Sequence, residues 1–150
     1  KYYSEEHGYN SRLDELHAEI LLNKLGNLDK YIKQRQSLAE KYNLMLKKTD
    51  LILPKVMKGN KHAYYLYVVR HIKRDSIINE LKKKNIIVNV SYPYPIHTMR
   101  GYKYLGYKKG DFPNTEKLSK EIFSLPLYPS LKDEEQDTIV DNLINILKKV

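Results

Sequence analysis

The chain has 150 residues, a formal net charge of +9 from 27 lysines and arginines against 18 aspartates and glutamates, and no cysteine. This length fits one domain, and 41% apolar with 30% charged residues is typical of a folded globular protein rather than a disordered tail. No segment approaches the roughly 18 apolar residues that a membrane-spanning helix needs. The absence of cysteine excludes disulfides and cysteine nucleophiles and fits a cytoplasmic protein. Because the sequence begins at Lys1 without methionine, we expect it to be a piece of a longer protein.

The excess positive charge raises the question of a nucleic-acid partner, because neutralised phosphates supply most non-specific affinity for nucleic acids. The distribution of charge argues against this partner. The chain has 22 lysines but only five arginines, and residues 82–84 are the only run of three lysines. Base reading relies on the arginine fork. We interpret the charge mainly as a solvated lysine-rich surface, with a phosphate or sugar-nucleotide ligand as a second explanation.

The first half of the chain predicts a long bent helix. Residues 1–10 form a polar, aromatic leading segment without a helical period. From Ser11 onwards, leucines and isoleucines recur at steps of three and four residues, which indicates an amphipathic helix. Asn10 or Ser11 can cap this helix, and Gly26-Asn27 is expected to kink or interrupt it before a second stretch that continues to Leu46.

The second half predicts three short strands and three shorter helices. The strands are expected at residues 62–72, 86–92 and 124–128, where β-branched and aromatic residues are dense. Helices are expected after Asp75, near residues 115–122 and over residues 133–149, with Asp75 as one cap and Asp133 with Gln136 as a capping box. The predicted fold class is α+β, one domain over residues 1–150 with helices packed on a small sheet of about three strands.

No complete catalytic motif is present. The sequence contains no phosphate-cradling glycine-rich loop, no GxSxG elbow and no HExxH helix. Five histidines show no metal-ligand spacing, and no thiolate could complete a metal site. We therefore expect no metal, and we look instead for binding residues.

The first candidate binding segment crowds polar donors around the start of the first helix. Free N–H groups and the helix dipole favour an anion at such a position. Asn10 and Arg12 could add side-chain donors to this anion site. The alternative is an ordinary capped helix in which Arg12 pairs with Asp14 or Glu15 on the surface.

The second candidate is the segment SYPYPIH at residues 91–97, where a strand runs into a proline-stiffened loop. Residues before proline are pushed into extended conformations, so Tyr92 and Tyr94 are expected to be held outward. Two phenol hydroxyls and the imidazole of His97 on a rigid loop suit a polyhydroxylated ligand. The alternative is that both tyrosines pack on the sheet edge and His97 satisfies a local backbone group.

Six segments in a fixed order resemble the C-terminal part of the DegT/DnrJ/StrS family of pyridoxal-phosphate-dependent sugar-nucleotide aminotransferases. The resemblance covers nearly the whole chain and is closest to members that aminate dTDP-linked keto-6-deoxyhexoses. The segments are GYNSRLDELHAEIL (8–21), LDKYIKQRQSLAEKYN (28–43), HAYYLYVVR (62–70), YPYPIH (92–97), GYKYLGYKKGDFPNTEKLSKEIFSLPLYPSL (101–131) and DEEQDTIVDNLINIL (133–147).

The resemblance implies the small C-terminal domain of a fold-type-I aminotransferase, with a mainly antiparallel sheet and a long first helix that leads to a larger domain. It also implies a homodimer in which pyridoxal 5'-phosphate carries an amino group, often from glutamate, to a nucleotide-linked keto sugar. The Schiff-base lysine is expected upstream of Lys1, because no SFxxxKxxxxGxGG-like segment occurs here. The chain alone is therefore expected to be inactive.

The resemblance also assigns roles to single residues. The asparagine of the GxNxR segment, Asn10 here, would reach the cofactor phosphate of the neighbouring subunit, with Arg12 near the same interface. The tyrosine and histidine of the YPxPxH loop, Tyr92 and His97, would face the sugar nucleotide.

Two more tyrosines are weaker candidates, and four residues depart from the family pattern. Tyr94 and Tyr9 are expected at the edge of the substrate site. The departures are His17 for a usual glutamine, Glu19 for alanine, Ser91 for histidine and Arg100 for proline. Since Ser91 and Arg100 border the substrate loop, the sugar preference is expected to differ from that of the typical member.

Three other functions remain open from the sequence. Some relatives use the same cofactor for dehydration, with histidine in place of the lysine, and the deciding position lies outside the chain. A basic nucleic-acid-binding module would also combine 14 tyrosines with many lysines. A purely structural or dimerisation fragment is the third possibility.

Overall fold

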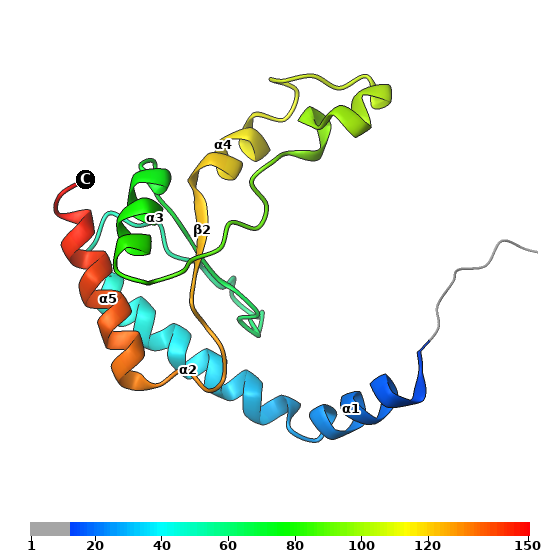
Figure 1. Cartoon of the computed structure of the whole chain (residues 1–150), viewed down its shortest axis with the longest axis vertical. Coiled ribbons are helices and arrows are strands. Elements are labelled where there is room, and N and C mark those ends of the chain that lie inside the picture. The colour runs from blue at the N-terminus through cyan, green and yellow to red at the C-terminus, as the bar shows by residue number, and fades with distance from the viewer. Residues whose placement is uncertain (1–12) are drawn as a thin grey trace, which may run out of the picture.

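The computed structural model describes residues 13–150. Nine elements follow one another in this part of the chain. They are α1 (Glu15–Leu25), α2 (Leu28–Leu46), β1 (Tyr67–Arg70), α3 (Arg74–Lys83), the 3-10 helices η1 (Ile96–Thr98) and η2 (Arg100–Leu105), α4 (Pro113–Glu121), β2 (Ile122–Leu125) and α5 (Asp133–Leu147). Figure 1 shows α2, α3 and α5 gathered around two strands, with α1 projecting from this body.

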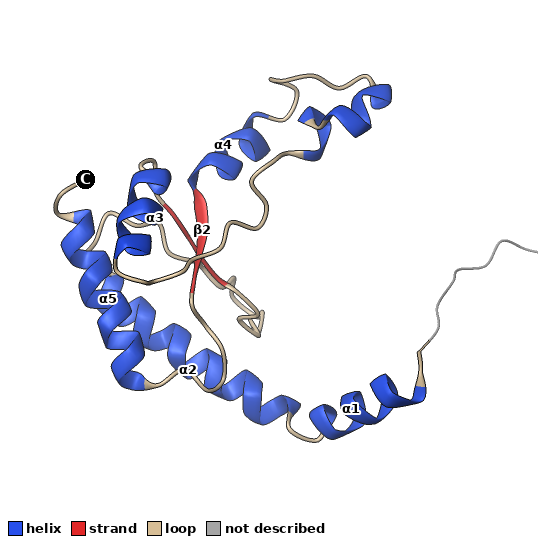
Figure 2. Cartoon of the chain, viewed as in Figure 1, coloured by secondary structure: helices blue, strands red, loops and turns tan. Residues whose placement is uncertain are grey.

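The sheet consists of β1 and β2, which pair antiparallel with Tyr67 opposite Leu125 and Arg70 opposite Ile122 (Figure 2). The predicted α+β class is confirmed. The segment 86–92, expected to be a third strand, contributes only a single bridge from Asn89 to Ser124. A longer ladder is blocked there because the chain turns into a loop with Pro93 and Pro95, which have no N–H to donate.

The predicted bend of the first helix is confirmed. Leu25 ends α1, Leu28 begins α2, and Gly26 lies between them with its N–H bonded to the carbonyl of Leu22 at 3.4 Å. Among the described residues, α1 buries none of its own, whereas α2 buries four side chains on its C-terminal half. The bend therefore separates a packed helix from a projecting one.

Three predicted caps are wrong. Asp14, rather than Asn10 or Ser11, caps α1, and its carboxylate accepts a hydrogen bond from the N–H of His17 at 2.9 Å. Helix α3 begins one residue before Asp75, so Asp75 lies in the first turn instead of capping it. At α5, the carboxylate of Glu135 reaches back to the N–H of Lys132 at 2.9 Å, in place of the expected pair of Asp133 and Gln136. At α1 and α5 several polar residues lie near the helix start, and the backbone path selects one, whereas at α3 the N-cap residue Lys73 forms no side-chain cap hydrogen bond.

The core is formed where α2 and α5 pack against the sheet. Tyr42 of α2 and Tyr67 of β1 are fully buried, with ring centroids 4.9 Å apart. The Tyr42 hydroxyl donates to the carbonyl of Pro126 at 2.8 Å, and the Tyr67 hydroxyl donates to Oδ1 of Asn43 at 2.7 Å. Burial raises the pKa of both phenols, so both remain protonated donors at any physiological pH.

Two further side chains fasten α2 to distant segments. Nη1 of Arg35 donates to the carbonyls of Leu127, Tyr65 and Tyr64 at 3.0, 3.1 and 3.3 Å. On the other side, the buried Gln136 of α5 donates to the carbonyl of Leu38 at 2.8 Å. These bonds fix the angle at which α2 leaves the body, and therefore where α1 projects.

None of the helices in the described part is long and apolar enough to cross a membrane.

Replacing Tyr42 with phenylalanine should lower the free energy of unfolding by about 1.5 kcal/mol, because the buried carbonyl of Pro126 loses its donor. Urea unfolding followed by circular dichroism measures this change. The matched control is Tyr65→Phe, since Tyr65 is 78% exposed. Equal stability of the two variants would contradict the assigned role of the Tyr42 hydroxyl.

Candidate functional site

The proline-stiffened loop lies between the Asn89 bridge and α4. Pro95 precedes η1, and the second short helix, η2, ends at Gly106, whose φ of 79° lies in the left-handed region that favours glycine. Pro113 occupies the first turn of α4, where its missing N–H costs nothing. Proline and glycine at these turns give the loop a defined path, and Figure 1 shows it extending away from the body.

Tyr92 and Tyr94 lie on the outer side of this loop, 80% and 69% exposed. Together they border an open groove of about 450 Å³ between the loop and α4. The other lining residues are mainly apolar, with Ile96 and Met99 from the loop and Leu118 from α4. The structure thus brings both predicted tyrosines to one groove and leaves their hydroxyls accessible.

His97 lies apart from that groove. The residue is buried, and its Nε2 is 3.0 Å from Oε1 of Glu116 on α4. Its ring also packs on Phe112, with centroids 4.9 Å apart. The sequence left a local backbone group as one possible partner of His97, and the structure gives it a carboxylate 19 residues further along the chain.

Glu116 joins both ends of the loop. Its Oε1 accepts from the N–H of Gly110 at 2.6 Å as well as facing the His97 imidazole. The hydrogen bond with His97, followed by that with Gly110, lowers the pKa of the Glu116 carboxyl. The carboxylate therefore remains charged and holds residues 97 and 110 against α4.

No sequence pattern marks Glu116 as a residue of the site. In the sequence it is one of several acidic residues near helix starts, for which dipole complementarity is a sufficient explanation. Its partner His97 is too distant in the chain for any local pattern to connect them. Tyr9, Asn10 and Arg12, the other predicted site residues, lie outside the described residues.

The described residues do not form a complete cofactor pocket. A Schiff-base lysine is activated by burial or by a neighbouring charge, yet no lysine within residues 13–150 is buried. At the start of α1, the N–H of His17 already donates to the Asp14 carboxylate, which leaves fewer backbone donors there, so a phosphate at this end would depend on further donors from residues before α1. Residues 13–150 thus supply a loop, a groove and a projecting helix.

This α+β domain has the fold of a part of solved aminotransferase structures. A DegT DnrJ EryC1 StrS aminotransferase from Brucella abortus matches with a TM-score of 0.88 and 32% identity over 98% of this chain and 39% of its own. DesV of S. venezuelae, solved in complex with a ketimine intermediate, superposes with a TM-score of 0.93 and 29% identity over 100% of this chain and 41% of its own. NtdA from Bacillus subtilis, solved with bound cofactor PMP, matches with a TM-score of 0.79 and 29% identity over 94% of this chain and 34% of its own.

The chain belongs to the DegT/DnrJ/EryC1/StrS aminotransferase family, whose model matches residues 1–144. It is 46% identical over 145 residues to the dTDP-3-amino-3,4,6-trideoxy-alpha-D-glucose transaminase of Micromonospora megalomicea subsp. nigra. That match covers 93% of this chain but only 39% of the relative. The chain therefore spans about two fifths of the length of this curated relative.

The Glu116→Gln variant tests the link between the loop and α4. Because the pKa of Glu116 is lowered in the folded state, the folded protein binds fewer protons at this carboxyl than the unfolded chain does. The stabilisation is complete above pH 4.5, the ordinary value, and is lost as the pH falls below it. We expect Glu116→Gln to lower the melting temperature at pH 6, and the difference from the wild type to narrow towards pH 3.

Thermal unfolding followed by circular dichroism at each pH measures this difference. Glu134→Gln is the matched control, since Glu134 also lies in the first turn of a helix but is exposed. A difference for Glu116→Gln that stays constant from pH 6 to pH 3 would contradict the assigned role of the carboxylate.

Proposed function

We propose that this chain is the C-terminal domain of a pyridoxal-phosphate-dependent aminotransferase that aminates a nucleotide-linked keto-deoxysugar. The observation that carries this proposal is the 46% identity, over 93% of the chain, to a dTDP-amino-sugar transaminase. The match of residues 1–144 to the family model supports the same reaction class.

The rest of the enzyme is proposed to pack on α1. This helix of 11 residues is too short to be stable in isolation, yet it buries none of its side chains in the described part of the chain. Its exposed apolar residues are Leu16, Ile20, Leu21, Leu22 and Leu25. A helix with exposed apolar side chains around most of its circumference is typically buried against a protein partner. A larger domain that supplies the Schiff-base lysine would cover it, so the chain alone is expected to be inactive.

The cofactor, pyridoxal 5'-phosphate, would accept the amino group from the donor and pass it to the sugar carbonyl. In the proposal, Asn10 and Arg12 bind the phosphate of this cofactor across a homodimer interface. Support comes from their position in the chain, a few residues before α1 begins at Glu15. A donor side chain there combines with the positive end of the helix dipole.

Tyr92 and Tyr94 are proposed to contact the nucleotide-linked sugar, with Tyr9 at the edge of the same site. Their exposed hydroxyls beside the apolar groove suit a ligand that has both hydroxyl groups and apolar ring faces. His97 is buried against Glu116 and lies apart from the groove, so it is proposed to support the sugar site by holding the loop in place and not by contacting the sugar.

The proposal also includes glutamate as the amino donor, a homodimer and a cytoplasmic location. The amino donor and the homodimer follow from the family resemblance. The location is supported by a sequence without cysteine, which is typical of a reducing compartment.

The decisive experiment follows nitrogen transfer by the full-length protein. With pyridoxal phosphate bound, a nitrogen-15-labelled amino acid, first glutamate and then other donors in turn, is added with dTDP-linked keto-6-deoxyhexoses, and the sugar products are analysed by mass spectrometry. We expect the label in the sugar of at least one substrate. Absence of label with every donor, with bound cofactor confirmed by its visible absorbance, would refute the aminotransferase.

A dehydratase of the same family is the second candidate, because the deciding lysine position lies outside this chain. The same experiment separates the two reactions. A dehydratase would convert the sugar with loss of a hydroxyl group and without incorporating the label.

Replacing Asn10 with alanine in the full-length protein should weaken cofactor retention, because the phosphate loses a side-chain donor. A loss of about tenfold in cofactor affinity corresponds to one charge-assisted hydrogen bond. The readout is the visible absorbance that remains after dialysis against cofactor-free buffer. Asn60→Ala is the matched control, since Asn60 is an exposed asparagine in a turn away from α1. Unchanged retention in Asn10→Ala would refute the phosphate role.

A further inference from the structure

A basic cleft of about 1120 Å³ lies between α3 and α5. Five lysines line it, and the only acidic side chain that does so is Glu80, within the described part of the chain. The lysines are Lys82, Lys83 and Lys84 at the end of α3, and Lys148 and Lys149 just after α5. The cleft shares no lining residue with the groove at Tyr92 and Tyr94.

The side chains of the cleft carry a net charge of +4, since five lysines face one glutamate. Of these lysines, only Lys83 forms an ion pair with a carboxylate among residues 13–150, and that carboxylate is Glu80. The main-chain oxygen of Val150, which also lines the cleft, accepts from Lys73 and not from one of these five lysines.

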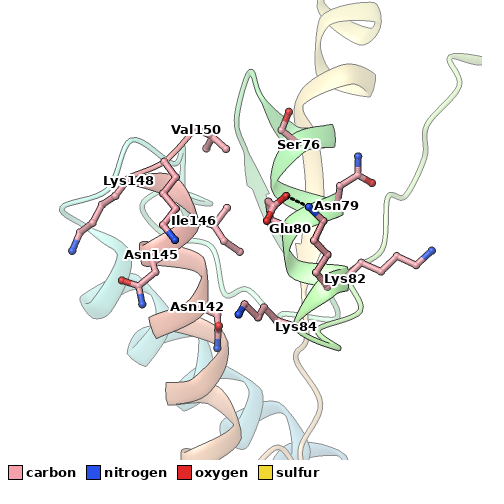
Figure 3. Close-up of a pocket in the computed structure, with 12 residues that line it drawn as sticks. Ser76, Asn79, Glu80, Lys82, Lys84, Asn142, Asn145, Ile146, Lys148 and Val150 are labelled. Atoms are coloured by element: carbon pink, nitrogen blue, oxygen red, sulfur yellow. Dashed lines mark hydrogen bonds and ion pairs between the residues drawn. The ribbon is translucent and has the colours of Figure 1, made fainter.

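Both walls of the cleft contribute lysines. Lys82, Lys83 and Lys84 lie at the end of α3, and Lys148 and Lys149 follow α5. The pKa of Glu80, which lies between them, is lowered first by its hydrogen bond with Lys83 and also by the charges of Lys149 and Lys84. Figure 3 shows Lys84 extending towards Asn142 on the opposite wall, while Lys82 and Lys148 extend outwards.

Helix dipoles do not account for this charge. Lysines favour helix C-termini because each end carries roughly half a negative charge. The C-terminal ends of α3 and α5 border this cleft at opposite ends, because Val150, after α5, reaches Lys73, just before α3. Together the two ends amount to about one negative charge against a side-chain charge of +4. Most of the positive charge is therefore without a counterpart in the cleft.

The uncharged lining residues indicate which kind of anion fits. Ser76, Asn79, Asn142 and Asn145 place hydroxyl and amide donors between the lysines, and all are labelled in Figure 3. No aromatic side chain is among the residues that line the cleft in the described structure. The cleft can thus neutralise and hydrogen-bond phosphate oxygens, but it has no platform on which a base could stack.

We propose that the cleft between α3 and α5 is a binding site for an oligophosphate group, with Lys83, Lys84 and Lys149 as its central cations. The two outward lysines form the rim and can turn towards a ligand that extends beyond the centre. The phosphates can belong to a free inorganic oligophosphate or to a nucleotide. This inference does not depend on the proposed aminotransferase activity.

The test is titration of the full chain with inorganic tripolyphosphate by isothermal titration calorimetry at 150 mM NaCl, where weak surface attraction is largely screened. We expect saturable binding at one site. The double variant Lys84→Gln/Lys149→Gln should bind about five- to tenfold more weakly, as the loss of two exposed ion pairs implies. Glu80→Gln removes the competing carboxylate and should bind severalfold more tightly.

The matched control is Lys117→Gln/Lys120→Gln, which removes the same charge from the exposed surface of α4. Circular dichroism confirms that each variant is folded. A parallel titration with uridine diphosphate separates the two sources of the phosphates, a free inorganic oligophosphate and a nucleotide. If uridine diphosphate binds no more tightly than inorganic pyrophosphate, the cleft recognises the phosphates alone. Failure to bind tripolyphosphate at 150 mM NaCl, or equal weakening in the control, would overturn the proposal.

Discussion

The packing of Tyr42 against Tyr67 and beneath Pro126 is the contact on which the rest of this structure depends. It joins α2 to both strands, since the Tyr42 ring lies against β1 and its hydroxyl reaches the residue that follows β2. A phenol is suited to this position because it combines a large apolar surface with one donor that can satisfy a buried carbonyl. The direction of α2, and with it the projection of α1, follows from this contact.

From this core, two features extend outwards. Helix α1 projects with exposed apolar side chains. The loop that carries Tyr92 and Tyr94 also projects from the body; in chain order it lies between β1 and β2. Both features lie on the same side of the view in Figure 1. Isolated apolar residues on a surface are ordinary, but a whole helix without a buried side chain is not. The chain spans about two fifths of the length of its curated relative, and the proposed larger domain would account for both features as surfaces that it covers.

Glu116 and Glu80 are both charged glutamates, but they have different roles in the structure. Glu116 has two partners from one loop and holds this loop against α4. Glu80 has one lysine partner and is surrounded by further lysines, so it compensates only a small part of the charge around it. In the first case the carboxylate completes a local structure, and in the second it leaves an excess of positive charge. Part of the net charge of +9 is therefore concentrated at the cleft between α3 and α5, which the composition could not reveal.

Local sequence patterns were enough to predict the α+β class, the bend at Gly26 and the positions of the main helices, because hydrophobic periods and turn residues act locally. Six short segments in one order also indicated the family. The partners of single side chains depend on the tertiary fold. In the structure, Asp14 caps α1, residues 86–92 form one bridge, and His97 pairs with Glu116. The packing of α3 against α5 also places lysines 65 residues apart along one cleft. Such pairs depend on how helices pack, and no local pattern encodes a contact between residues so distant in the chain.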